Sequence, residues 1–136
     1  MEKQPTLQEI VTLAKTAGQI VLEGFNQLHD IQFKSEVDVV TEMDHRSEDY
    51  LLGEIRSRFP DHSILSEESG AINSQRENCW IVDPLDGTIN YSHKLPIYSI
   101  SIAYQHAGEL QMGVVYDPSL NECFSAEKGR GAWLND

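Results

Sequence analysis

The hydrophobic residues in the first quarter of the chain recur at the period of an α-helix. From residue 7 to about residue 29 they return every three or four positions, a spacing that gathers them on one side of a helix. Thr6 and Glu9 open this run with the Thr-x-x-Glu pattern of a capping box, in which each side chain accepts a hydrogen bond from the backbone N–H of the other residue. The pattern therefore predicts a first helix over this range.

A second run of helical period follows. Its apolar face carries Tyr50, Leu51 and Ile55. Residues 41–44 repeat the capping-box pattern, which places the start of this helix near Thr41, and Phe59-Pro60 ends it because proline cannot continue a helix. A short extended piece over residues 31–34 is expected to join the two helices.

The second half of the chain alternates hydrophobic residues with smaller or polar ones, which is typical of strands with one buried face. The expected strands are 62–66, 80–82, 98–104, 112–116, 122–126 and 132–134. Turn residues separate the later strands, and residues 71–78 are expected to form a polar loop. This order predicts an α+β fold, with two N-terminal helices before a largely antiparallel sheet that ends where a further strand is expected to return.

Composition and charge narrow the possible partners. The 136 residues are 40% hydrophobic, which is enough for one compact domain with its own core. With 10 basic and 22 acidic residues the net charge is −12, which argues against nucleic acid or an anionic membrane as a partner because both require a basic surface. An acidic protein that handles an anion needs local positive charge, and bound metal cations are the usual source.

Leader, membrane and cysteine signals point to the cytoplasm. Residues 1–5 lack the charged-then-apolar layout of a signal peptide, and no apolar run approaches the length of a membrane span. Cys79 and Cys123 have neither metal-ligand nor redox spacing, so both are expected to be buried free thiols in a reducing compartment.

The segment with the most chemical content is residues 80–96, WIVDPLDGTINYSHKLP. Pro84 favours a tight turn directly after the strand, and such a turn can bring Asp83 and Asp86 to one side. Two carboxylates held close together repel each other unless they are protonated or bridged by a cation. Carboxylate oxygens are the ligands that Mg²⁺ prefers, and the free carbonyl of Leu85 can join them.

This segment has two interpretations. In the first it is a phosphate site, because Gly87 lets the backbone approach a ligand and a helix beginning there would point the N–H groups of Gly87 and Thr88 at an anion. In the second it is a plain turn with a helix cap, since Asp, Pro and Gly are the commonest turn residues. An EF-hand loop is excluded because the alternate-residue spacing of its acidic ligands is absent.

Other candidate residues lie around this segment, each with a structural alternative. Glu67-Glu68 follows a strand end, where functional sites gather and where solvated loops also carry paired glutamates. Asp44 belongs to its own capping-box pattern, which would give it a structural role. His93 has no other ligand type near it in the sequence, so a hydrogen-bonding role is expected.

Taken together, these motifs resemble those of the inositol monophosphatase family. DVVTEMD (38–44), SEES (66–69) and WIVDPLDGTINYSHKLP (80–96) occur in the order and spacing of that family, and GVVYDPSLNECFSAEKGRGAWLN (113–135) is similar to its strand pair and Gly-x-Gly turn. The Asp-Pro-Leu-Asp-Gly-Thr motif is highly specific in combination with an upstream Glu-Glu. The resemblance implies the layered α/β sandwich of the inositol monophosphatase and fructose-1,6-bisphosphatase type.

The resemblance also implies roles for individual residues. By this correspondence the metal ligands are Glu67, Asp83, Asp86 and the carbonyl of Leu85. The substrate phosphate would lie against residues 85–88 (Leu85, Asp86, Gly87 and Thr88), chiefly on the amides of the last two. Asp44 and the hydroxyl of Thr88 correspond to a pair that orients the attacking water. Mg²⁺, as two or three ions, is the implied cofactor, and Li⁺ the implied inhibitor.

The implied reaction is hydrolysis of a phosphate monoester of inositol or a related sugar alcohol by metal-activated water, without a covalent phospho-enzyme. Relatives acting on 3′-phosphoadenosine phosphates, fructose 1,6-bisphosphate or histidinol phosphate share the same core motif and stay as alternatives. Members of the family are commonly dimers. We therefore expect a small phosphorylated substrate and a homodimer of the full-length form.

The sequence departs from the family pattern at two points. Ile89 stands where the family usually has a second threonine. The Trp-Asp-x-Ala-Ala-Gly motif of the family's C-terminal half, whose aspartate completes the second metal site, does not occur in the 136 residues. Residues 1–136 are thus expected to be an N-terminal metal- and phosphate-binding half. The non-enzymatic alternative is a chain that binds metal or phosphate, or assembles with a partner, without turnover.

Overall fold

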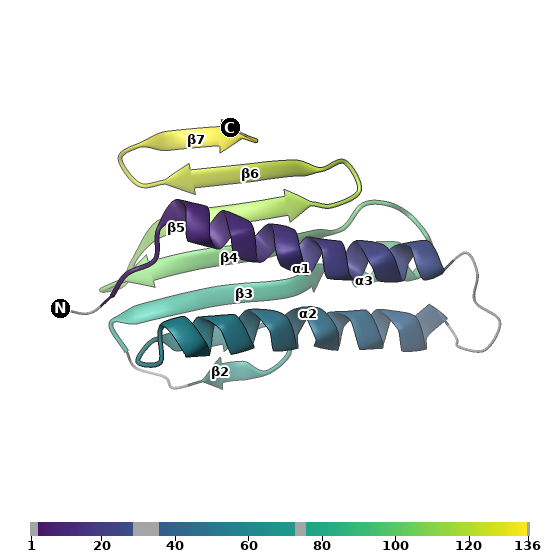
Figure 1. Cartoon of the computed structure of the whole chain (residues 1–136), viewed down its shortest axis with the longest axis horizontal. Coiled ribbons are helices and arrows are strands. Elements are labelled where there is room, and N and C mark those ends of the chain that lie inside the picture. Colours follow the sequence, from purple (N-terminus) through teal and green to yellow (C-terminus); the bar gives the residue numbers. More distant parts are fainter. Residues whose placement is uncertain (1–2, 29–35, 73–75, 136) are drawn as a thin grey trace.

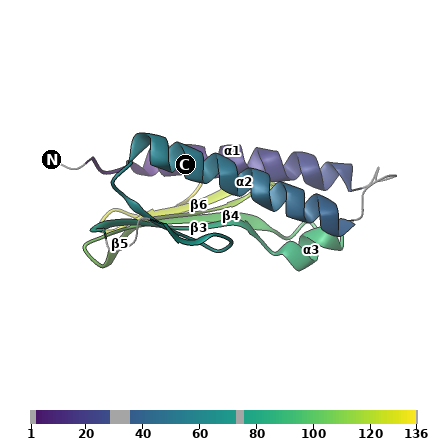
Figure 2. The ribbon, with the colours of Figure 1, turned by 90° about the horizontal axis from the view of Figure 1, so that it is seen from below.

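Two long helices lie side by side across one face of a seven-stranded sheet (Figure 1). The structure is a computed structural model that describes residues 3–28, 36–72 and 76–135. Figure 2 shows both helices on the same side of the sheet. The expected α+β architecture is confirmed, whereas the extended piece expected over residues 31–34 lies outside the described residues.

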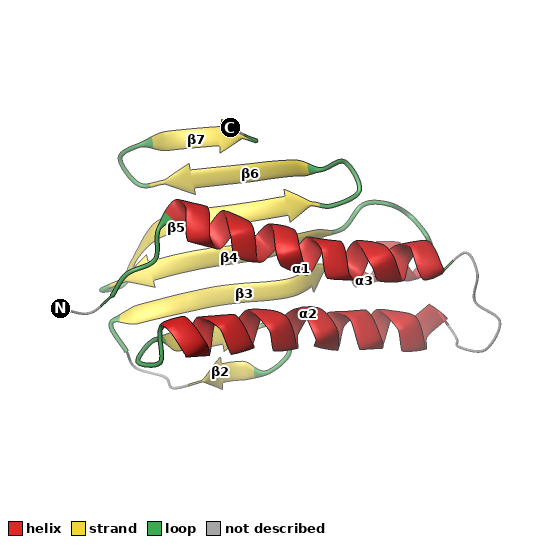
Figure 3. Cartoon of the chain, viewed as in Figure 1, coloured by secondary structure: helices red, strands yellow, loops and turns green. Residues whose placement is uncertain are grey.

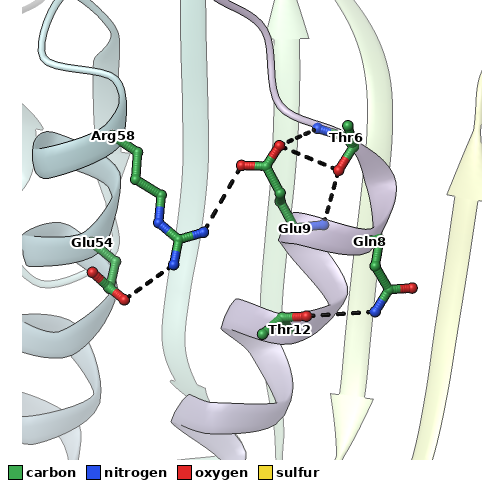
Figure 4. Close-up of polar contacts among 6 residues, drawn as sticks. All are labelled: Thr6, Gln8, Glu9, Thr12, Glu54 and Arg58. Carbon is green, nitrogen blue, oxygen red and sulfur yellow. Dashed lines mark hydrogen bonds and ion pairs between the residues drawn. The ribbon is translucent and has the colours of Figure 1, made fainter.

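The first helix, α1 (Leu7–Gln27), begins at the expected capping box. The Thr6 hydroxyl accepts a hydrogen bond from the Glu9 N–H at 3.1 Å, and the Glu9 carboxylate accepts one from the Thr6 N–H at 3.2 Å (Figure 4). The same carboxylate lies 3.9 Å from the Arg58 guanidinium at the end of the second helix. The helices are therefore linked at this end by polar contacts as well as by their apolar faces.

The second helix, α2 (Glu36–Arg58), begins earlier than expected. The predicted start near Thr41 is wrong, because residues 41–44 lie inside the helix and cannot cap it. Val39 and Met43 are buried, 4% and 1% exposed, so the apolar face of the helix begins before the capping-box pattern and continues through it. Tertiary burial thus overrides the local start signal.

The strands run in the order β2-β1-β3-β4-β5-β6-β7 across the sheet. Their bounds are β1 (Ser63–Ser66), β2 (Gly70–Ile72), β3 (Asn78–Asp86), β4 (Ser99–His106), β5 (Glu109–Asp117), β6 (Glu122–Glu127) and β7 (Gly131–Leu134). A short helix, α3 (Thr88–Ser92), follows β3 (Figure 3). The loop expected over residues 71–78 is wrong in part, because β2 covers its first two residues and pairs antiparallel with β1, and β3 begins at its last residue, Asn78.

One strand pair departs from the antiparallel pattern. β1 pairs parallel with β3, with Ser66 opposite Val82, while the other neighbours in the sheet are antiparallel. The carboxyl ends of β1 and β3 therefore meet at the same edge of the sheet. This is the feature that positions the candidate site.

The core lies between the helices and the sheet. Its largest fully buried side chains are Trp80, Tyr91, Tyr104, Tyr116, Ile10, Leu13, Leu28, Met43, Leu51, Ile55, Ile64 and Ile100. The opposite face of the sheet carries alternating residues of the same strands, and several of these are exposed apolar side chains such as Leu65, Ile81 and Phe124. No helix in the described part of the chain has the length and apolar character needed to span a membrane.

Candidate metal and phosphate site

The Asp83-Pro84-Leu85-Asp86 segment is a β-bulge at the end of β3. Asp83 pairs with Ser101 of β4, but Asp86 pairs with Ser99, so β3 carries one extra residue between these positions. The tight turn expected here is wrong, since the strand continues to Asp86. Pro84 suits the bulge because it has no N–H to place in the ladder. The Leu85 N–H donates to Asp83 Oδ1 at 3.2 Å, which orients that carboxylate.

Gly87 makes the connection from β3 to α3 possible. Its φ of 87° is left-handed, and a Cβ there would lie 2.8 Å from the carbonyl oxygen of Ile97. Only glycine fits without strain. The Gly87 carbonyl accepts from the Tyr91 N–H at 2.9 Å, and the Tyr91 hydroxyl donates to the Val21 carbonyl at 2.6 Å, which anchors α3 to α1. Thr88 is the first residue of the short helix, as the phosphate interpretation requires.

Parallel pairing brings Glu67 beside the bulge. Glu67 opens the turn between β1 and β2, and its N–H donates to the carbonyl of Val82 at 3.0 Å. Glu67 and Asp83 line a common cavity of about 320 Å³, together with Ser66 and Ser101. The rest of its lining is apolar: Leu65, Ile81, Val82 and Ala103. Two candidate metal ligands that are 16 positions apart in the sequence thus share one hollow.

Helix α2 approaches the bulge and the β1–β2 turn with three buried polar residues: Asp44, Ser47 and Glu48. The Ser47 hydroxyl donates to the Pro84 carbonyl in the bulge at 2.7 Å. Glu48 accepts hydrogen bonds from the hydroxyls of Ser66 and Ser69. Ser47 and Glu48 were missed by the sequence analysis. Their spacing of three and four residues from Asp44 is a signal that could have found them, because it places all three on one helix face.

Three other carboxylates, those of Asp86, Glu67 and Glu68, lie close enough to act on Asp83. Burial raises the pKa of Asp83 to about 6, and the charges of Asp86, Glu67 and Glu68 add to this effect. The hydrogen bond from the Leu85 N–H opposes it. A site that penalises its own negative charge in this way gains from a bound cation.

Asp44 is held in a similar environment. Burial raises its pKa to about 7, aided by a hydrogen bond with Glu68 and by the charges of Glu68, Asp83 and Glu48. Within the described part of the chain, Asp44 Oδ1 is buried and has no hydrogen-bond partner. A buried, unpartnered carboxylate oxygen is costly unless a ligand or water satisfies it.

The donor set fits a hard divalent cation better than a softer metal. Its side chains are carboxylates, and oxygen ligands of this kind are those that Mg²⁺ prefers. Among the described residues, no three His, Cys, Asp or Glu side chains are close enough together to hold a metal ion by themselves, and Asp86 is exposed. The structure therefore brings Glu67, Asp83 and the bulge together as a partial, open donor set.

The remaining sequence candidates have structural roles. The ring of His93 hydrogen-bonds the carbonyl of Ile89 through Nδ1 at 2.8 Å, as expected for a non-ligand. Cys79 and Cys123 are free thiols. Cys123 is buried, but the expectation of a buried Cys79 is wrong because its side of β3 faces away from the helices and leaves it half-buried.

Sequence comparison gives one family. Residues 2–136 match the sequence model of the "Inositol monophosphatase family". A "Nus factor SuhB" from Pasteurella multocida is 42% identical over 135 residues, covering 97% of this chain and 51% of that protein. A "Fructose-1,6-bisphosphatase/inositol-1-monophosphatase" from Thermotoga maritima is 40% identical over 126 residues, covering 92% of this chain and 48% of that protein. The chain thus spans about half the length of the curated relatives it matches.

Solved structures agree with this result. An inositol monophosphatase from Anabaena superposes with a TM-score of 0.78 at 38% identity, covering 95% of this chain and 48% of that one. The extragenic suppressor protein SuhB from Bartonella henselae gives 0.80 at 33% identity, covering 93% and 49%. A Staphylococcus enzyme solved with 2′-AMP bound gives 0.78 at 30% identity, covering 90% and 45%.

Proposed function

The chain belongs to the inositol monophosphatase family, and from this premise we propose that it carries the metal- and phosphate-binding part of a Mg²⁺-dependent phosphatase. The proposed substrate is a phosphate monoester of inositol or a related sugar alcohol. The observation that supports the proposal is the parallel pairing of β1 with β3, because Glu67 and Asp83 then line one cavity, and Gly87 and Thr88 follow the bulge directly in the chain.

Glu67, Asp83, Asp86 and the Leu85 carbonyl would hold Mg²⁺, as two or three ions. When bound, such ions polarise the phosphate and make water a better nucleophile at neutral pH. The bulge supports this role because its extra residue disrupts the ladder locally and can free a backbone carbonyl for a ligand. The Ser47 hydroxyl donates to the neighbouring Pro84 carbonyl at 2.7 Å and ties the bulge to α2.

The phosphate would lie on the N–H groups of Gly87 and Thr88. Gly87 allows this approach because it has no Cβ. Asp44 Oδ1, buried and without a partner among the described residues, would hold the attacking water together with the Thr88 hydroxyl. The water oxygen bonds to phosphorus as the ester P–O bond breaks, and one proton of the water is passed to the departing oxygen, which leaves as the alcohol.

The test is a panel of phosphate monoesters assayed with and without Mg²⁺, using this chain and a full-length form. The panel includes inositol 1-phosphate, fructose 1,6-bisphosphate, histidinol phosphate, 3′-phosphoadenosine phosphates and 2′-AMP. Asp83→Asn is expected to abolish Mg²⁺-dependent turnover and to preserve the fold, while Glu54→Gln on the outer side of α2 is the charge-matched control. Turnover by Asp83→Asn at the rate of the unchanged protein would remove the proposal.

A second candidate is metal or phosphate binding without turnover by the 136-residue chain itself. It is favoured by the incomplete donor set among the described residues and by the exposed apolar face of the sheet. Mn²⁺ binding by this chain, with no hydrolysis of any member of the panel, would select it. For the full-length form we propose Li⁺ inhibition, a homodimer and a cytoplasmic location, which Li⁺ titration, sedimentation and fractionation test in turn.

A further inference from the structure

One face of α2 contacts both segments that carry proposed metal ligands: the bulge in β3 and the turn between β1 and β2. Asp44, Ser47 and Glu48 lie on the same side of this helix and are 8%, 0% and 5% exposed. Buried polar side chains are costly unless they are hydrogen-bonded, so the partners of this stripe indicate what it does. Two partners are loops of the candidate site.

Ser47 holds the bulge. Its hydroxyl donates to the Pro84 carbonyl at 2.7 Å, between the two aspartates of the bulge. The contact is buried and joins residues 37 positions apart. It fixes the direction of the extra residue in β3, and with it the direction in which Leu85 presents its carbonyl.

Glu48 holds the turn between β1 and β2. Its Oε2 accepts from the Ser66 hydroxyl at 2.7 Å, and its Oε1 accepts from the Ser69 hydroxyl at 2.6 Å. Ser66 and Ser69 flank Glu67-Glu68, so one carboxylate bridges the base of the turn that carries a proposed ligand. Hydrogen bonds to an ionised acceptor are roughly twice as strong as neutral ones. Both oxygens of Glu48 thus accept a serine hydroxyl, and Glu48 is not among the residues that line the cavity with Glu67 and Asp83.

We propose that Glu48 is a positioning residue: by bridging Ser66 and Ser69 it holds Glu67 beside Asp83 in the geometry that binds the metal. This role rests on the metal site proposed above. Removal of the bridge frees the turn from α2 and loosens the Glu67 N–H from the Val82 carbonyl, so Glu67 loses its fixed direction.

The first test uses Mn²⁺ as the probe, with binding to the 136-residue chain measured by electron paramagnetic resonance at 25 °C. Glu48→Ala is expected to weaken Mn²⁺ binding by about 10- to 100-fold, the range typical of residues that orient metal ligands. Asp49→Ala is the matched control, because it removes a neighbouring but exposed carboxylate of the same helix and should bind Mn²⁺ as the unchanged chain does.

A double-mutant cycle separates the bridge from a general loss of charge. The Ser66→Ala/Ser69→Ala variant should reproduce the weakening, and adding Glu48→Ala to it should weaken binding little further, since all three changes remove one interaction. If Glu48→Ala binds Mn²⁺ as tightly as the unchanged chain while Glu67→Gln does not bind it, the positioning role is overturned and the proposed metal site stands. If the unchanged chain itself does not bind Mn²⁺, the metal site in this chain is overturned instead.

The second test needs no metal and decides the role of Glu48 in either case. Amide hydrogen exchange, followed by NMR in the metal-free chain, should become several-fold faster at Glu67 and Glu68 in Glu48→Ala and stay unchanged in β4 and β5. Unchanged exchange at Glu67 overturns the positioning role. A uniform rise across the sheet overturns it too, because it would assign Glu48 to overall stability.

Discussion

The two faces of the sheet differ in how completely their side chains are buried. On the face under α1 and α2, alternate residues such as Trp80, Ile102 and Val114 are at most 2% exposed. On the other face the intervening residues stay in part exposed, with Phe124 at 47% and Leu65 at 47%. The same strands thus have one face packed into a buried core and one face that stays partly exposed to solvent.

This difference in burial indicates which part of the sheet stabilises the fold and where the candidate site lies. The helix-covered face supplies the burial that stabilises the fold, because apolar area removed from water is the dominant favourable contribution. The candidate site lies where the two faces meet: Asp83 projects with the open face, while Asp44 approaches from the helix side. The bulge in β3 carries Asp83 on the open face and contacts α2 on the other.

The comparison is tested most strongly by truncating one aromatic residue on each face. Trp80→Ala is expected to lower the free energy of unfolding by about 3–5 kcal/mol, because it opens a cavity in a packed core. Phe124→Ala is expected to lower it by about 1 kcal/mol, since nearly half of the ring is already in water. Urea denaturation measures both values. Equal losses would show that the open face contributes as much as the covered one.

A second pair of variants addresses the junction of β3 and α3. Gly87→Ala is expected to cost about 2–4 kcal/mol, because it combines a left-handed backbone with a Cβ 2.8 Å from the Ile97 carbonyl oxygen. Gly108→Ala has a similar φ of 81° but open space around the new Cβ, so about 1 kcal/mol is expected there. Thermal unfolding compares them, and equal costs would mean that the close approach to Ile97 is unimportant.

The pH dependence of stability tests whether the carboxylates of Asp44 and Asp83 destabilise the fold when they are ionised. Asp44 and Asp83 have pKa values of about 7 and about 6 in the folded chain, above the ordinary value of 3.8. Between about pH 4 and about pH 7 the folded state therefore binds more protons than the unfolded state, so stability in the absence of metal should fall as pH rises from about 4 to about 7. Urea denaturation in EDTA at a series of pH values measures this. The fall should be smaller in Asp44→Asn, and an identical fall there would contradict the assignment.

The smallest effect is expected at the solvent-exposed end of the covered face. Arg58→Ala removes the contacts with Glu9 and Glu54 shown in Figure 4, at 3.9 and 3.3 Å. Both pairs are partly exposed, so the loss should be within about 0.5 kcal/mol and should vanish at high salt. A loss above 1 kcal/mol in urea denaturation would assign these contacts a larger part in joining the helices.

Much of this architecture was predictable from the sequence because it depends on local patterns. The capping box at Thr6 and the strands of the second half follow from side-chain spacing, and the structure confirms them. The start of α2 was not predictable in the same way. The capping-box pattern at residues 41–44 competes with burial of Val39 and Met43, and burial prevails.

The candidate site was predictable only as a set of residue types. Asp83, Pro84 and Gly87 indicate unusual backbone geometry, but the same letters permit a turn or a bulge. The pairing of Asp86 with Ser99 selects the bulge, and that pairing depends on β4, more than ten residues further along the chain. The spacing of Ser47 and Glu48 places them on one helix face with Asp44, but their partners become visible only once α2 lies against the bulge and the turn.

The sequence by itself determined most of the helices and strands, which faces are apolar, and which side chains can supply oxygen ligands. Only the tertiary structure decided that β1 runs parallel to β3 and that Glu67 therefore lies beside Asp83. The physical reason is that alternation with period two specifies which face of a strand is buried but neither its neighbour nor its direction. Those are set by the packing of the helices and by the connection through β2, which involve the whole chain.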